Sequence, residues 1–163
     1  MTTKLNSTDE RLLRAAIKLS ARARRAGNQP YGALLADAQG QVLLEAGNTQ
    51  VTTGDCTGHA ELNLMRDASA RFDREQLATC TVYASGEPCP MCAGALYWAG
   101  VRRLVFGLSI ETMTALAGPG ADELALHCVD VLTSGTQPVE VLGPALEDEA
   151  RRVFDAPQGS TTS

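Results

Sequence analysis

Apolar and polar residues recur along this chain with spacings that predict helices and strands. Within residues 8–26 the apolar side chains fall three and four positions apart, which predicts an amphipathic helix capped at its start by Thr8 or Asp9. Two apolar runs, residues 31–37 and 41–46, lie on either side of a turn sequence and predict a β-hairpin. Neither run alternates cleanly between apolar and polar residues, so we expect a sheet that is covered on both faces.

The rest of the chain continues as helices and strands. We expect helices over residues 59–72, 90–99 and 110–117 and a final helix that opens at Pro144, and strands over residues 80–85, 102–107, 128–132 and 138–142. The polar segment 47–58 predicts a loop. The length predicts one domain over residues 1–155, with a disordered tail over residues 156–163.

Charge and cysteine content narrow the classes of function. Apolar residues make up 44% of the chain and charged residues 20%, as in ordinary globular domains, and the net charge is -5. An acidic chain argues against a nucleic-acid partner, which usually needs a basic face. Five cysteines without an apolar leader favour a reducing cytoplasm over a disulfide scaffold, and no apolar run approaches the ~20 residues that cross a bilayer.

Two short motifs contain the residues best suited to chemistry, His59-Ala60-Glu61 and Pro88-Cys89-Pro90-Met91-Cys92. The imidazole of His59 and the thiolates of Cys89 and Cys92 are zinc ligands, and three protein ligands leave the fourth position for water, as catalytic zinc sites do. The two cysteines lie three residues apart, so they share one face of a helix whose start favours thiolates. Glu61 could move the protons of the water, provided that residues 59 and 61 lie where the helix begins.

The residues alone leave three interpretations open. The first is a catalytic zinc enzyme. The second is a non-catalytic binding module with a structural zinc, whose fourth ligand would be Cys56, Cys80, Cys128 or His127; it leaves Glu61 without a role. The third is a redox or nucleophilic cysteine enzyme, in which the histidine and the glutamate would have no function.

The order of the two motifs resembles the cytidine-deaminase-like family of zinc nucleoside and nucleobase deaminases. The resemblance covers residues 29–107 and implies a three-layer α/β/α fold with a five-stranded mixed sheet. It also implies a zinc ion on His59, Cys89 and Cys92, Glu61 as the residue that transfers protons, and hydrolytic release of ammonia from a small nucleobase. Active sites in this family commonly lie near subunit contacts, so the resemblance implies a homodimer.

Within that family, the segment that begins at Asn48 is most similar to bacterial guanine deaminases. The similarity implies that Asn48 holds the edge of the base and that Tyr31 stacks on it. Free N–H groups at the start of the helix over residues 59–72 favour negative charge, so the N–H group of Ala60 is a candidate donor to a metal-bound hydroxide or a ring oxyanion. From the residues alone, Asn48 could instead hold its own turn and Tyr31 could pack in the core.

Guanine deaminases also use an acid after the strand that ends at Gly107. Met113 stands at the corresponding position, so Glu111, Asp122 or Glu123 would have to serve, and we take Glu123 as the substrate contact. The expected substrate is guanine or a related amino-purine or amino-triazine, with cytosine-type bases open. A tRNA adenosine deaminase, which converts adenosine to inosine, is the alternative, because the run after Met91 resembles those enzymes as well.

Overall fold

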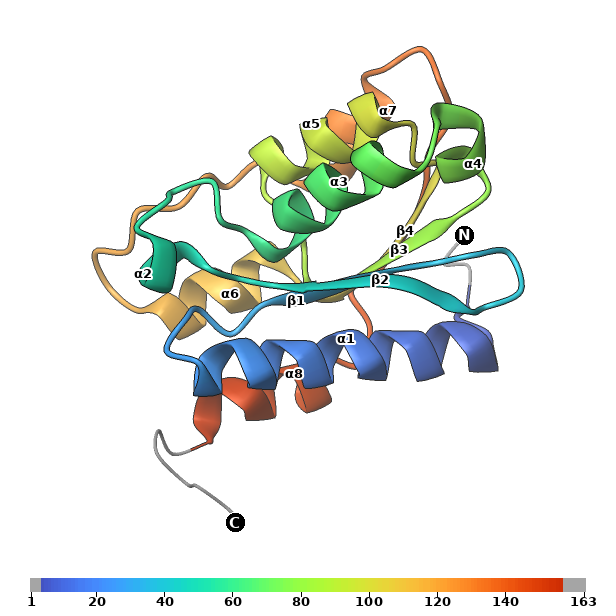
Figure 1. Ribbon diagram of the computed structural model, residues 1–163. Coiled ribbons are helices and arrows are strands. Elements are labelled where there is room, and N and C mark those ends of the chain that lie inside the picture. Colours follow the sequence, from blue (N-terminus) through green and yellow to red (C-terminus); the bar gives the residue numbers. More distant parts are fainter. Residues whose placement is uncertain (1–3, 157–163) are drawn as a thin grey trace.

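A five-stranded mixed sheet forms the centre of the computed structural model, which describes residues 4–156 (Figure 1). The strands are β1 (Gly32–Ala36), β2 (Val42–Gly47), β3 (Thr81–Gly86), β4 (Arg103–Leu108) and β5 (Glu140–Leu142). They lie in the order β2-β1-β3-β4-β5; β1 is antiparallel to β2 and β3, whereas β4 is parallel to β3 and β5. The predicted hairpin and the mixed sheet are confirmed.

Helices cover both faces of this sheet. They are α1 (Ser7–Arg25), α2 (Gln50–Thr53), α3 (Ala60–Arg71), α4 (Arg74–Ala78), α5 (Pro90–Ala99), α6 (Ile110–Ala117), α7 (Cys128–Thr133) and α8 (Glu147–Asp155). Helices α1 and α8 lie on one face and α3, α5 and α7 on the other, which gives the expected three layers (Figure 1). Within residues 4–156, no helix combines the length and the apolar character needed to cross a bilayer. The predicted tail lies outside the described residues, apart from Ala156, which caps α8.

The apolar runs without alternation belong to strands that separate two cores. In β1 all five residues are buried. Leu35 packs in the core beneath α3 and α5, whereas its neighbour Leu34 packs in the core beneath α1 and α8, because successive side chains of a strand point to opposite faces. Coverage on both faces is therefore confirmed for β1. The edge strand β2 is only partly buried.

The cap of α1 differs from the prediction. Asn6, rather than Thr8 or Asp9, is the N-cap: its side chain accepts a hydrogen bond from the Asp9 N–H group at 2.8 Å, and the Asp9 carboxylate accepts one from the Asn6 N–H group at 3.3 Å. This reciprocal pair is a capping box. The Asp9 side chain is also buried, where it accepts hydrogen bonds from the Tyr83 hydroxyl at 2.7 Å and from Arg103 at 2.8 and 3.0 Å.

The strand predicted over residues 128–132 is wrong, because this segment forms helix α7. The N–H group of Cys128, at the start of the helix, donates to the buried carboxylate of Glu87 at 3.0 Å, a tertiary contact that local sequence does not reveal. Two short helices, α2 and α4, were also not expected. The other predicted helices and strands are present, with ends within a few residues of the predicted ones.

The topology brings several loops to one edge of the sheet. Strands β3 and β4 are parallel, so both end at this edge, and β1 begins there because it is antiparallel to β3. Tyr31 precedes β1, Asn48 follows β2 and Glu87 follows β3. Crevices at the carboxyl ends of strands are where open α/β sheets commonly bind ligands.

Candidate active site

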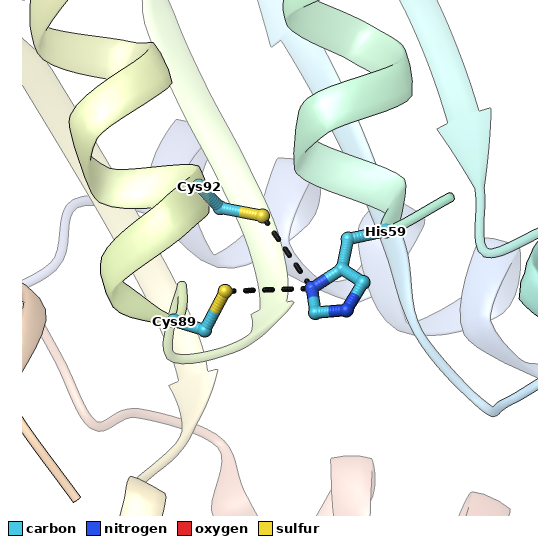
Figure 2. A group of neighbouring side chains, drawn as sticks. All are labelled: His59, Cys89 and Cys92. Carbon is cyan, nitrogen blue, oxygen red and sulfur yellow. Dashed lines mark hydrogen bonds between the residues drawn. The ribbon is translucent and has the colours of Figure 1, made fainter. Parts of the chain in front are cut away.

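The two motifs meet because each one begins a helix. His59 is the N-cap of α3 and Cys89 is the N-cap of α5, and both have extended backbone angles. The two helices pack against each other on the same face of the sheet. Their first turns therefore bring His59, Cys89 and Cys92 together, with the imidazole of His59 facing both sulfur atoms (Figure 2).

The distances in this group fit a zinc ion. The Nδ1 atom of His59 lies 3.4 Å from the sulfur of Cys89 and 3.6 Å from the sulfur of Cys92. Zinc bonds of ~2.0 Å to nitrogen and ~2.3 Å to sulfur at tetrahedral angles place such atoms about 3.5 Å apart. Among residues 4–156, no fourth Cys, His, Asp or Glu has a ligand atom within 4.8 Å of all three. The donor set suits a metal with one coordination position left open.

Cysteine and histidine electrostatics favour a cation here. Hydrogen bonds from Cys92 and with His59 together lower the pKa of the Cys89 thiol to about 4, against the opposing effect of burial. The pKa of Cys92 is raised, because this thiol donates to Cys89 and is buried. The hydrogen bond with Cys89 also raises the pKa of His59. The metal-free site therefore already holds one thiolate, which is the form that binds zinc.

Glu61 is buried beside the ligand group but is not part of it. Only 5% of the residue is exposed, and its carboxylate does not belong to the group of atoms that could share an ion. Burial raises the pKa of Glu61 to about 7, and hydrogen bonding with Cys92 partly opposes this rise. His59 precedes the helix while Glu61 lies in its first turn, and for this reason two side chains only two residues apart can approach the same point.

Tyr31 and Glu123 come close to this centre from two other segments. Burial raises the pKa of the Tyr31 hydroxyl, and the nearby negative charges of Glu123 and Glu61 raise it further. The charge of Glu123 also contributes to the raised pKa of His59. The ring of Tyr31 packs edge-on against Phe154 of α8, with ring centroids 5.7 Å apart. Met113, which the resemblance to guanine deaminases places where an acid was expected, lies against the end of β3 at Gly86.

Asn48 is buried and its side chain is engaged in a turn. Its Oδ1 atom accepts a hydrogen bond from the Gln50 N–H group at 3.0 Å, and its Nδ2 group donates to Gln50 Oε1 at 2.7 Å. Its backbone N–H group donates to the carbonyl oxygen of Tyr31, which joins these two candidate residues. Ala60 is buried in the first turn of α3, where backbone N–H groups have no partner within the helix.

Sequence reasoning did not find the contacts of Glu87. This residue separates β3 from the second motif and is buried, and it binds His127 and the backbone of two helices. The one sign in the sequence that Glu87 belongs to the site is its position directly before Pro88 of the second motif. Of the other acids considered as substrate contacts, Glu111 faces His127 at 3.0 Å, and Asp122 is exposed in the same segment as Glu123.

Comparison with known proteins agrees with these motifs. Residues 6–108 match the family described as the cytidine and deoxycytidylate deaminase zinc-binding region. The chain is 41% identical over 150 residues to a probable cytosine deaminase of Schizosaccharomyces pombe, covering 91% of each protein. It is 37% identical over 101 residues to the tRNA-specific adenosine deaminase of Haemophilus influenzae, covering 62% of this chain and 58% of that protein.

A solved structure supports the same assignment. The guanine deaminase of Bacillus subtilis superposes with a TM-score of 0.61 at 36% identity, covering 70% of this chain and 71% of that one. The matched family is zinc-binding, and the three side chains of Figure 2 supply a His/Cys/Cys group for the metal. The chain therefore belongs to the zinc-binding family of cytidine and deoxycytidylate deaminases.

Proposed function

We propose that this chain hydrolytically deaminates a free, amino-bearing nucleobase, guanine or a related purine or triazine, and releases ammonia. The observation that supports this most is the group formed by His59, Cys89 and Cys92, which leaves a coordination position open beside the buried, uncoordinated carboxylate of Glu61. A structural zinc site would have four protein ligands, and the described residues supply three.

The proposed chemistry assigns one role to Glu61. Zinc, when bound by the three ligands, supplies a water acidic enough to act as the nucleophile. Glu61 accepts a proton from this water and donates it to the ring nitrogen beside the amino-bearing carbon, while the oxygen adds to that carbon. The same carboxylate then carries the proton of the new hydroxyl group to the amino group, which leaves as ammonia. In the metal-free protein burial raises the pKa of Glu61 to about 7. A bound cation would favour the carboxylate, which is the form that accepts the first proton.

We assign the base itself to residues around this centre. Asn48 would hold the base edge after its Nδ2 group leaves Gln50, while its Oδ1 atom keeps the turn. Tyr31 and Glu123 would lie on the other side of the base. The charges of Glu123 and Glu61 both raise the pKa of the Tyr31 hydroxyl, which supports this placement. The N–H group of Ala60, at the positive end of α3, would stabilise negative charge near the reacting carbon.

A cytosine-type base is the second candidate. The supporting observation is 41% identity to a probable cytosine deaminase over 91% of both proteins, whereas the similarity to guanine deaminase covers 70% of this chain. Both candidates are free bases, so the same zinc chemistry serves either one.

An anticodon loop suits this chain less well. Residues 104–150 contain eight aspartates and glutamates and no lysine or arginine, and this stretch includes the segment that carries Glu123. A tRNA substrate would bring phosphates to an acidic surface, which lowers affinity. Adenosine in tRNA therefore ranks below a free base.

Two further proposals concern the oligomeric state and the cellular location of the protein. We expect a homodimer, because Met91 and Trp98 lie seven residues apart on α5 and are 37% and 75% exposed, and exposed apolar side chains on one helix face favour association. We also expect a cytoplasmic protein, in keeping with its five free cysteines.

A screen of ammonia release tests the function. The substrates are guanine, cytosine, adenine, ammeline, their nucleosides and an anticodon stem-loop. At least one free base should react, and Glu61→Gln should abolish turnover while zinc, measured by mass spectrometry, stays bound. Glu75→Gln, which removes an exposed charge on α4, is the matched control and should keep full activity. Turnover of the stem-loop alone would contradict the proposed substrate class, and an unchanged Glu61→Gln enzyme would contradict the mechanism.

A further inference from the structure

The buried side chain of Glu87 lies in the turn before the metal ligand Cys89, here called the metal-ligand turn. It contacts both ends of the segment 110–128, which contains α6 and leads into α7. The Glu87 carboxylate accepts a hydrogen bond from the Ile110 N–H group at 2.9 Å and one from the Cys128 N–H group at 3.0 Å. Ile110 is the first residue of α6 and Cys128 is the first residue of α7. One side chain, two positions before the ligand Cys89, therefore holds the start of both helices.

His127 completes this connection through both of its ring nitrogens. Its Nδ1 atom lies 3.1 Å from a Glu87 oxygen, and its Nε2 atom lies 3.0 Å from a Glu111 oxygen. The Nδ1 contact with Glu87 is a hydrogen bond, whereas the Nε2 contact with Glu111 has the distance of an ion pair. Two carboxylates facing one imidazole favour its protonated form. Glu111 belongs to α6 and His127 caps α7, so the imidazolium joins the two ends of the segment directly.

The arrangement suits an ion pair better than a bound metal. Both Glu87 oxygens already accept hydrogen bonds from backbone N–H groups, which a metal ion would have to displace. The three side chains line a cavity of about 400 Å³ whose other lining residues are uncharged, with the Cys128 thiol among them. Asp130 on α7 is the remaining charge that acts on His127. Burial raises the pKa of Cys128, so this thiol stays neutral.

The segment that is held in this way passes the candidate metal site. Helix α6 packs with the core beneath α1 through Met113, whereas α7 packs through Cys128 in the core beneath α3 and α5. The chain between them therefore goes round the edge where β3 and β4 end (Figure 1). Glu123, in this segment, is close enough to influence the pKa of both His59 and Tyr31.

We propose that His127 is a positioning residue: as the imidazolium, it joins Glu87 to Glu111 and so holds the 110–127 segment, with Glu123, against the metal-ligand turn. The hydrogen bond with Glu87 is the main reason that the pKa of His127 is raised above its usual 6.5. A raised histidine pKa means that the contact is fully present below 6.5 and is lost as the pH rises through the raised value. The segment is therefore held while His127 is protonated and is released as the imidazolium loses its proton.

Proton NMR tests the contact of His127 with Glu87 and Glu111 without any substrate. The chain has two histidines, and zinc on His59 prevents that ring from titrating, so His127 gives the one titrating imidazole signal of the zinc-loaded protein. Its midpoint should lie above 6.5, and Glu111→Gln should lower it, whereas Glu75→Gln should leave it in place. Amide protection factors over residues 111–126, which correct for base-catalysed intrinsic exchange, should fall through the same midpoint. A midpoint at or below 6.5, or exchange that is independent of this titration, would overturn the proposal.

The activity readout of this inference rests on the proposed function. His127→Gln should keep bound zinc and raise KM about tenfold, as expected for the loss of a charge-assisted contact, with kcat changed less than about threefold. The KM of the wild type should rise with pH through the His127 midpoint, and the KM of His127→Gln should not follow that titration. A merely structural role would give no such difference in the pH profile. If no base is deaminated at all, the proposed function fails, and NMR and hydrogen exchange still test whether His127 holds the segment.

Discussion

Replacing Glu61 with glutamine should stabilise the metal-free protein while it abolishes activity. The carboxyl group is 5% exposed, and burial raises its pKa from 4.5 to about 7. In the unfolded chain the group ionises near 4.5, so the folded state loses relative stability as the pH rises from 4.5 to 7. A difference of this size corresponds to about 3 kcal/mol of unfolding free energy above pH 7, at 1.36 kcal/mol for each pH unit. A neutral amide of the same size removes this penalty.

Urea denaturation of the chelated proteins measures this difference. At pH 4 the free energies of unfolding of wild type and Glu61→Gln should agree, since the carboxyl group is neutral in both states there. Between pH 5 and 7 the wild type should lose stability relative to the variant, and at pH 8 the variant should be more stable by up to about 3 kcal/mol. The charge of Glu61 also raises the pKa of His59 and of Cys92, so the measured gap includes the altered titration of these two groups.

Zinc should reduce the stability advantage of the variant. A cation next to the carboxylate favours its charged form, so the stability gap should shrink in the zinc-loaded proteins. Turnover of the loaded Glu61→Gln enzyme should fall by at least ~10²-fold, the lower end of the usual range for a residue that transfers protons. A metal-free variant that is less stable than wild type at pH 8, or a gap that is the same at pH 4 and pH 8, would refute the reasoning. Glu75→Gln should show no gap at either pH.

Three further predictions follow from other contacts. Arg103→Leu leaves the buried Asp9 carboxylate without its cation, so urea unfolding at pH 7 should show a loss of about 3–5 kcal/mol. Burial alone would raise the pKa of Asp9, but hydrogen bonds from Arg103 and Tyr83 keep it below 3.8, so the gap should close as the pH falls through that lowered value. Cys89→Ala removes one metal ligand, and mass spectrometry should detect far less than one zinc ion per chain, with loss of ammonia release. Asn48→Ala should raise KM for the reacting base about tenfold, equivalent to about 1.4 kcal/mol, and leave zinc bound; an unchanged KM in steady-state assays would remove Asn48 from the substrate site.

Sequence spacing predicted the elements whose packing is repeated over several turns or along a whole strand. Helix α1 has apolar positions that fit the helical period only. The hairpin of β1 and β2 was marked by two apolar runs on either side of a turn sequence. Helix α7 is short and carries Val129 and Val131, which favour a strand locally. Its helical start depends on Glu87, 41 residues earlier in the chain, and no local pattern contains that contact. Helix α4 could have been predicted from the sequence, because Asp73 and Gln76 have the spacing of a capping box.

The metal ligands could be predicted from local spacing, whereas the residues proposed to surround the base could not. The metal group was predictable because each motif supplies ligands at fixed spacing from a helix start, and only one long-range contact, between α3 and α5, had to form. The surroundings of the base were not predictable to the same degree. Asn48 holds its turn, as the residue alone allowed, and its contact with the base stays a proposal. The bridge through His127 joins segments 40 residues apart, and nothing near His127 in the sequence marks its partner.

The position of the site at two helix starts explains why its charges can be held together. Cys89, Cys92 and Glu61 can each carry a negative charge, and His59 alone among the ligands can offset one when the metal is absent. The free N–H groups at the starts of α3 and α5 favour negative charge, each by up to about 1 kcal/mol, which is smaller than the penalty of about 3 kcal/mol carried by Glu61 alone. The balance must come from a bound cation. A site that is destabilised when empty and stabilised when loaded couples zinc binding to folding, so zinc should raise the Tm of the wild type more than it raises that of Glu61→Gln.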